Sequence, residues 1–469
     1  MTTIETSRST IFYAALLLAT CHVALAQVPR PWPRVVNGLP STSFPQVGAI
    51  LSVGGVDGQE RFHTTCTGTL IGCSTVLTAA HCVCPEEADH AADCHSLGVA
   101  DPAGIFVFFQ HAGYLPVENV VIHPGYEFAV ASDLAILKLA VPVSGFPPFP
   151  INEIASPVPG TRGTIVGFGI TGDDRSDSGI KRYGSVTTSS CDGWVPQATS
   201  VCWEFVEPIG APGDDSSGCH GDSGGPLFMN VDGQPVLAGV TSGGFPTCFA
   251  DSFGFDTNVY FDREWVRSEA GADLGGERCG DLPQIGDSGT IVASVANGTL
   301  SEDLSEGELA IEVPEKTTLL RVTLNGWDES GYILGVQEAN DFDLYVRFGE
   351  KPTGDAFDCV DPTTGAYGMC EIDFPNPGVW HVAATRFVGW GAFQLTAVAF
   401  SQAAPTQCAG NCNGDHEVSI DELLTMVNIA LGSTAVSECI AGDTGGDGAI
   451  TVDEILEAVN VALTACSSG

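Results

Sequence analysis

Short apolar runs, broken by glycine and proline, dominate the first 270 residues of this 469-residue chain. Two examples are "VGAIL" at 47–51 and "GTIVGFG" at 163–169, each of strand length and each followed by turn-forming or polar residues. Many short strands of this kind are typical of an all-β barrel or sandwich. The pattern therefore predicts a mainly β fold for this part of the chain.

A second group of strand-like runs occupies residues 288–401, after an acidic, glycine-rich stretch at 271–287 that we expect to be a linker. The runs are "TTLLRVTLNG", "DFDLYVRFG", "GVWHVAATR" and "GAFQLTAVAF". They predict a β-sandwich as a second domain. The segment resembles the bacterial pre-peptidase C-terminal domains of secreted proteases, on the strength of "DFDLYVRFG" and "PNPGVWHVAA".

The C-terminal part repeats itself, with "NCNGDHEVSIDELLTMVNIAL" from Asn411 and "DTGGDGAITVDEILEAVNVAL" from Asp443. Each copy is a polar loop followed by apolar residues at helical spacing. Oxygen-bearing side chains recur at loop positions one, five, nine and twelve, which is the spacing of a calcium loop. The repeat predicts a small α-helical calcium-loop module at 408–466, and metal-free acidic turns are the alternative.

The repeat resembles dockerin-type modules, which implies bound calcium and a cohesin-like or cell-surface partner. His416 stands where glycine usually makes the turn, and Gly445 offers no side-chain ligand. The expected calcium ligands are Asn411, Asn413, Asp415, Ser419 and Glu422 in the first loop, and Asp443, Asp447, Thr451 and Glu454 in the second.

The N-terminal segment has the features of a secretory signal peptide at 1–26. It carries an arginine near its start, an apolar run over 11–20 and the small-residue site Ala24-Leu25-Ala26. A lipid anchor at Cys21 is an alternative that Thr20 disfavours. No other apolar run is long enough to span a bilayer. We therefore expect an extracellular protein with no membrane span.

Composition and charge narrow the function classes. The formal net charge is -41, which disfavours binding to nucleic acid or to anionic membranes. Removal of Cys21 with the signal leaves sixteen of the 17 cysteines, an even number that favours disulfides over a metal cluster.

Three motifs place candidate chemistry in the first 270 residues. "TAAHC" contains His81, "SDLAILKL" contains Asp133 and "GDSGGP" contains Ser223. A serine hydroxyl becomes a strong nucleophile when a histidine takes its proton and a buried aspartate orients that histidine. An α/β-hydrolase, which shares the G-x-S-x-G pattern, would place its acid and histidine after the serine. The only downstream histidines are His381 and His416, so that alternative fails.

The order and spacing of these motifs resemble the chymotrypsin-like serine endopeptidases over residues 35–270. The resemblance implies a double β-barrel and a secreted endopeptidase that acts on proteins or peptides, with His81, Asp133 and Ser223 as its triad and no catalytic cofactor. A catalytically silent scaffold in a binding or adhesion protein is the alternative.

The resemblance also implies an activation step. Residues 27–34 would be an activation peptide, and cleavage after Arg34 would free the amine of Val35 to pair with Asp222. This pairing would shape an oxyanion hole from the backbone N–H groups of Gly221 and Ser223.

The same comparison places Ser217 at the base of the primary specificity pocket, with Gly244 and Gly254 along its walls. A neutral pocket favours large apolar residues such as phenylalanine, tyrosine or leucine. Gly243 stands where an aromatic residue commonly forms part of the substrate wall. Lysine or arginine specificity stays open, because four aspartates lie near in sequence: Asp214, Asp215, Asp251 and Asp256.

The family likeness implies the pairs Cys66–Cys82, Cys191–Cys202 and Cys219–Cys248. Cys359 and Cys370 bracket a loop in the predicted sandwich and form a fourth expected pair. The pairing of the remaining cysteines is open on sequence grounds. They are Cys73, Cys84, Cys94 and Cys279 in the first part, and Cys408, Cys412, Cys439 and Cys466 in the tail.

Overall fold

The computed structural model describes most of the chain after the expected signal and activation segments. The described residues are 35–54, 61–191, 193–245, 247–287, 289–329, 339–401, 409–413, 417–445 and 448–464. Several residues singled out in the sequence lie outside these ranges: Cys21, Arg34, Cys408, Asp415, His416, Asp447 and Cys466.

Six antiparallel strands close the first barrel in the order β2-β3-β4-β7-β6-β5. They are β2 (Val47–Gly54), β3 (Arg61–Gly72), β4 (Thr75–Thr78), β5 (Ile105–Phe109), β6 (Gly113–Ile122) and β7 (Ala135–Leu139). Apolar side chains such as Leu70, Val76 and Leu137 fill its core. Closure leaves no free sheet edge, so the predicted short strands pair completely.

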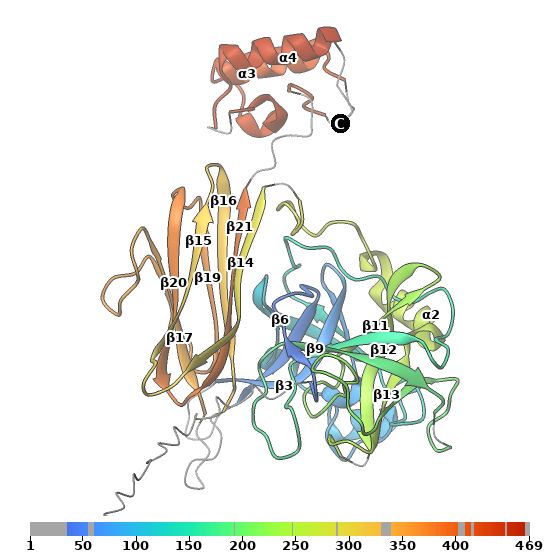
Figure 1. Cartoon of the computed structure of the whole chain (residues 1–469). Coiled ribbons are helices and arrows are strands. Elements are labelled where there is room, and N and C mark those ends of the chain that lie inside the picture. The colour runs from blue at the N-terminus through green and yellow to red at the C-terminus, as the bar shows by residue number, and fades with distance from the viewer. Residues whose placement is uncertain are drawn as a thin grey trace, which may run out of the picture. The chain divides into compact units, whose positions relative to one another are not determined.

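A second ring of six strands follows, in which β8 pairs with both β9 and β11. The strands are β8 (Arg162–Gly167), β9 (Arg182–Ser189), β10 (Ser200–Phe205), β11 (Pro226–Val231), β12 (Gln234–Phe245) and β13 (Ser252–Asn258). A two-residue strand, β1 (Leu39–Pro40), pairs with β9. Helix α2 (Val259–Ala270) follows β13 directly (Figure 1), and the Asn258 side chain caps its N-terminus. The mainly β, double-barrel prediction is confirmed.

Further strands lie between Thr290 and Ser401 and form two four-stranded sheets, β14-β21-β16-β19 and β15-β20-β17-β18 (Figure 1). Their bounds are β14 (Thr290–Leu300), β15 (Glu306–Val313), β16 (Thr317–Gly326), β17 (Asp341–Phe348), β18 (Cys359–Asp361), β19 (Tyr367–Asp373), β20 (Gly378–Val388) and β21 (Gly391–Ser401). In β17, Phe342, Leu344 and Val346 are fully buried, as the alternating pattern predicts. The likeness to pre-peptidase domains stays a prediction.

The tail contains two helices, α3 (Ile420–Ala430) and α4 (Val452–Thr464), labelled in Figure 1. Its core consists mainly of Met426, Ile429 and Ala458. Leu431 and Leu463, which continue the apolar spacing of the two helices, are 76% and 79% exposed. The spacing alone places them on the buried face, but this small module has too little core to cover them.

Seven disulfides occur among the described cysteines. They join Cys66–Cys82, Cys73–Cys279, Cys84–Cys94, Cys191–Cys202, Cys219–Cys248, Cys359–Cys370 and Cys412–Cys439. The Cys73–Cys279 bond ties the segment after α2, expected as a linker, to the first barrel. Within the described ranges, the helices include none with the length and apolar character needed to cross a membrane.

Candidate active site

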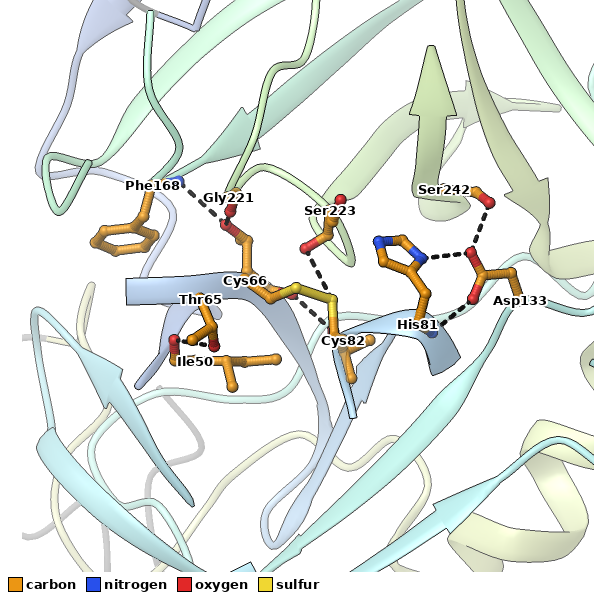
Figure 2. Close-up of a disulfide and its surroundings, with 12 residues drawn as sticks. Ile50, Thr65, Cys66, His81, Cys82, Asp133, Phe168, Gly221, Ser223 and Ser242 are labelled. Atoms are coloured by element: carbon orange, nitrogen blue, oxygen red, sulfur yellow. Dashed lines mark hydrogen bonds and ion pairs between the residues drawn. A yellow bond between two sulfur atoms is a disulfide. The ribbon is translucent and has the colours of Figure 1, made fainter. Parts of the chain in front are cut away.

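His81 and Asp133 form a close pair between the two barrels. The His81 Nδ1 atom lies 2.7 Å from Asp133 Oδ2, and the His81 backbone N–H donates to Asp133 Oδ1 at 3.0 Å. The Ser242 hydroxyl donates to Oδ2 at 2.6 Å. Figure 2 shows the other ring nitrogen of His81 on the side of Ser223. The three candidate catalytic residues therefore meet although 142 residues separate His81 from Ser223 in the sequence.

Local structure fixes each member of this pair. His81 lies on a 3-10 turn, η1 (Ala80–Cys82), directly after β4, and the Cys66–Cys82 disulfide attaches this turn to β3 (Figure 2). Asp133 precedes β7, and the residue before it, Ser132, has a φ of 55°. A serine in this left-handed region indicates a constrained loop that aims the neighbouring carboxylate.

The electrostatics of the pair suit a histidine base. Burial by itself lowers the pKa of His81, but the Asp133 charge and hydrogen bond raise it above its usual value of 6.5. Burial by itself raises the pKa of Asp133, but the contacts with His81 and Ser242 lower it by more. The pKa of Asp133 therefore lies below its usual value of 3.8. Asp133 is therefore ionised at neutral pH and stabilises an imidazolium.

Ser223 sits on a turn that only glycine allows. Gly221 and Gly224 have φ values of 91° and 77°. A side chain on Gly224 would come within 2.4 Å of the Thr67 carbonyl oxygen and 2.0 Å of the Thr78 hydroxyl. The Ser223 carbonyl accepts from the Thr67 N–H at 2.8 Å. The segment "GDSGGP" thus forms a tight glycine turn, and this turn also presents Ser223 to the cavity shared with His81.

The backbone around this turn has free donors. Among the described residues, the N–H groups of Gly221 and Ser223 donate to no protein acceptor. Asp222 between them is buried and accepts from the Gly169 and Cys219 N–H groups, both at 2.9 Å. Burial raises the pKa of Asp222 to about 6. A buried carboxyl with a raised pKa gains stability from a nearby cation.

Val35, expected as the new N-terminus, is 1% exposed and packs in a cluster with Ile165, Val201 and Trp203. The next residue, Val36, accepts a hydrogen bond from the Ser217 N–H at 3.1 Å. The segment after Arg34 therefore lies against Ser217, which lines the same cavity as Ser223.

The cavity has a volume of about 390 Å³ and contains all three expected pocket residues, Ser217, Gly244 and Gly254. Its wall includes His81 and Ser223, together with Thr241 and Trp203. The four aspartates that left basic specificity open are not in this wall: Asp214, Asp215, Asp251 and Asp256.

The sequence analysis missed several residues of the site. Phe128 contacts the His81 ring edge-on, with 5.6 Å between the ring centroids. Glu86 and Asp89 line the cavity from the loop that the Cys84–Cys94 disulfide closes. Trp203 was also missed, because its position depends on the pairing of β10 with β13. The Ser242 contact gives no local signal, since serine before glycine is a common turn pair.

In the tail, the glutamates at loop position twelve turn back over their loops. Glu422 accepts from the N–H groups of Asn413 and Ser419 at 3.1 and 2.7 Å, and Glu454 accepts from those of Gly445 and Thr451 at 2.6 and 2.7 Å. Both carboxylates are more than nine-tenths buried. The described donor set consists of carboxylate, amide and hydroxyl oxygens, which is the chemistry that calcium prefers.

Two closed barrels, with a histidine–aspartate pair and a serine in one cavity, define the class of chymotrypsin-like serine proteases. A family model described as Trypsin matches residues 40–266. Chymotrypsin-like elastase family member 1 from Felis catus is 31% identical over 226 residues, which cover 45% of this chain and 78% of that protein.

Trypsin from Phaedon cochleariae is 29% identical over 220 residues, which cover 45% of this chain and 81% of that protein. Serine protease 56 from Mus musculus is 30% identical over 271 residues, which cover 54% of this chain and 41% of that protein. The match thus spans less than half of Serine protease 56. The chain belongs to the trypsin family, and its domain is that of a serine endopeptidase.

Proposed function

We propose that this protein is a secreted serine endopeptidase that hydrolyses peptide bonds through an acyl-enzyme. The observation that carries the proposal is the 2.7 Å contact between His81 Nδ1 and the buried Asp133 carboxylate, in the cavity that also contains Ser223. The seven disulfides and the trypsin-family relatives support an oxidising, extracellular location.

In the proposed reaction, Ser223 Oγ attacks the carbonyl carbon of the scissile bond while His81 Nε2 takes the hydroxyl proton. The Gly221 and Ser223 N–H groups bind the oxygen that gains negative charge. The intermediate collapses with cleavage of the C–N bond, and His81 gives its proton to the leaving amine. Water then repeats the sequence and releases the acid product and Ser223.

The activation step belongs to the same proposal. Cleavage after Arg34 frees the Val35 amine, whose positive charge pairs with Asp222 and keeps this carboxylate ionised. The buried Val35 side chain and the raised pKa of Asp222 support this step. An ionised, paired Asp222 holds the two N–H groups of the oxyanion hole in place.

We further propose that the primary pocket takes large apolar side chains. Its neutral residues, Ser217, Gly244 and Gly254, support this preference. Lysine or arginine specificity would need a carboxylate that reaches the side chain bound beside Ser217. The carboxylates that line the cavity are Glu86 and Asp89, between Cys84 and Cys94, and Asp173, whose Oδ2 atom accepts from the Cys248 N–H at 3.1 Å. The buried Asp256, two residues after Gly254 on β13, does not line the cavity.

For the tail we propose a calcium-ordered module that docks onto a cohesin-like or cell-surface partner. The inward-turned Glu422 and Glu454 support a cation in each loop, where calcium would supply the positive charge that these buried carboxylates lack. Equivalent positions of the two helices expose leucine, at 55% for Leu424 and 56% for Leu456, which supports a protein partner.

Ser223→Ala tests the catalytic proposal. We expect hydrolysis of a peptide substrate to fall about ten-thousand-fold, because only binding and the oxyanion hole remain, and we expect labelling by a fluorophosphonate to disappear. Ser96→Ala, which changes an exposed serine outside the cavity, serves as the matched control. Undiminished hydrolysis by the Ser223 variant would favour another nucleophile, whereas absence of hydrolysis and of labelling in the cleaved parent would favour a silent scaffold.

A further inference from the structure

The sheet β14-β21-β16-β19 is buried on both faces. One face contributes apolar side chains such as Val322 to the core of the sandwich. The other face of an antiparallel sheet is ordinarily exposed to water, yet every residue of β21 is buried. The barrels and the sandwich belong to one compact unit, and polar side chains of the second face contact the barrels. They are Arg321, Thr323 and Asn325 of β16 and Gln394 of β21.

Gln394 is fully buried and joins several groups of the protease domain. Its Oε1 atom accepts from the Lys181 N–H at 2.9 Å and from the side-chain amide of Gln110 at 2.8 Å. Its Nε2 atom donates to the carbonyl oxygens of Ser41 and Lys181 at 3.0 and 3.1 Å. Both ends of this amide therefore use their hydrogen-bonding capacity on the barrels, which is how a buried polar side chain becomes tolerable.

The sandwich also contacts the residues just before β9. Asn325 donates to the Gly179 carbonyl oxygen at 2.7 Å, and Asp328 Oδ2 accepts from the Ser178 hydroxyl at 2.9 Å. Residues 176–179, with the sequence "SDSG", belong to no helix or strand. An irregular segment makes few backbone contacts of its own, so partners outside it determine how well it keeps one conformation.

The same part of the chain contacts the turn that carries Ser223. The guanidinium of Arg182, the first residue of β9, donates to the carbonyl oxygens of Gly169 and Asp177 at 2.9 and 3.0 Å. The Gly169 N–H in turn donates to Asp222 Oδ1 at 2.9 Å. Two successive hydrogen bonds therefore connect the start of β9 with the residue that precedes Ser223.

We propose that the β-sandwich is an activating domain built into this chain, and that Gln394 is a positioning residue for the turn that carries Ser223. Through Lys181 the sandwich fixes the start of β9, and β9 fixes Asp222 through Gly169. Asp222 stands between the two residues whose N–H groups would form the oxyanion hole. The catalytic half of this inference rests on the endopeptidase function proposed above, whereas the docking of the sandwich onto the barrels does not.

The docking is tested without catalysis, in a Ser223→Ala background that prevents self-digestion. A recognition sequence for a site-specific protease is inserted after the exposed Gly286. Among the described cysteines, no disulfide joins the two sides of this position, because Cys73–Cys279 lies before it. After the cut, we expect the two pieces to elute together in gel filtration. Separate elution would overturn the docking.

The positioning role is tested in the full chain by Gln394→Met, which keeps an unbranched side chain of similar size and removes the hydrogen bonds. We expect kcat per fluorophosphonate-labelled site to fall about tenfold, with KM within about twofold of the parent, as coupling through a packed network implies. A merely structural role would lower the number of labelled sites and leave kcat per site unchanged. Asn297→Ala, at an exposed amide of β14, is the control and should match the parent.

An unchanged kcat per labelled site in Gln394→Met would overturn the positioning role. If this variant fails to fold, Ser178→Ala removes only the hydroxyl that contacts Asp328, and we expect it to lower kcat per site at least about twofold. An unchanged value there would count against the proposal in the same way. Absence of labelling and of hydrolysis in the cleaved parent would instead refute the endopeptidase function, and gel filtration would still decide the docking.

Discussion

Replacement of Asp262 by asparagine probes how the fold holds the loop that carries Asp133. Asp262 lies in the first turn of α2, with its side chain 4% exposed. Its Oδ1 atom accepts from the Ser132 hydroxyl at 2.9 Å, and Ser132 directly precedes Asp133. In the described part of the chain, Oδ2 has no partner. Burial raises the pKa of Asp262 to about 6, although the Ser132 hydrogen bond lowers it in part.

The direction of the effect follows from this shift. A folded pKa of about 6, against 3.8 for an unperturbed carboxyl, means that the folded state binds the Asp262 proton more tightly than the unfolded state. Below pH 4, Asp262 is protonated in both states, so it costs the folded state no stability. The loss of stability grows between pH 4 and pH 6 and is complete above pH 6. The full shift corresponds to about 3 kcal/mol. His123 Nε2 lies 3.5 Å from Oδ1, but burial lowers the pKa of His123 to about 4, so this imidazole is neutral and does not offset the charge.

Asparagine keeps an oxygen for Ser132 and removes the charge. We expect Asp262→Asn to raise the free energy of unfolding by up to about 3 kcal/mol at pH 7.5, and to leave it within about 1 kcal/mol of the parent at pH 4. Urea unfolding at both pH values, in a Ser223→Ala background to prevent self-digestion, gives the measurement. Glu118→Gln, at an exposed glutamate of β6, is the control and should show no such pH dependence. A difference between Asp262→Asn and its parent that is the same at pH 4 and pH 7.5 would refute the reasoning.

Two further predictions concern activation and the tail. Arg34→Gln should prevent cleavage before Val35 and keep activity at the level of the uncleaved chain, as measured by N-terminal sequencing and peptide hydrolysis; full activity without cleavage would contradict the proposed pairing with Asp222. Calcium should stabilise the tail in the full chain by about 2.7 kcal/mol at a hundredfold excess over its Kd, and Glu454→Gln should weaken binding in calorimetric titration. Absence of both heat and stabilisation at millimolar calcium would mean that the repeat is a helix pair held by disulfides.

The parts of the molecule that local physics determines could be predicted from the sequence. The glycines of "GDSGGP" are required because Gly221 and Gly224 adopt positive φ values and Gly224 lies against the backbone of β3 and the turn after β4. Short strands and their alternation follow from residue type, so the mainly β architecture was accessible as well. Three separate motifs in the family's order then brought His81, Asp133 and Ser223 together in the prediction.

Features that depend on pairing between distant segments could not be predicted. The Cys73–Cys279 disulfide spans 206 residues, and four cysteines allow three pairings, so the sequence alone could not select it. The sequence around Trp203 identifies it only as an apolar strand residue. Trp203 lines the cavity because β10 pairs with β13 in a register that places it opposite Gly254, and no residue near Trp203 in the sequence predicts that register.

The same core links the proposed activation step to the proposed specificity. Val35 and Trp203 share one apolar cluster, and Val36 bonds to Ser217 at the base of the cavity. The Val35 side chain is already buried in the uncleaved chain, so cleavage after Arg34 is not needed to build this wall of the cavity. What cleavage would add is the positive charge of the new amine, which would pair with Asp222 beside the turn that carries Ser223. We therefore expect the uncleaved chain to bind substrate in a formed cavity but to hydrolyse it slowly, because nothing yet holds the two N–H groups of the oxyanion hole in place.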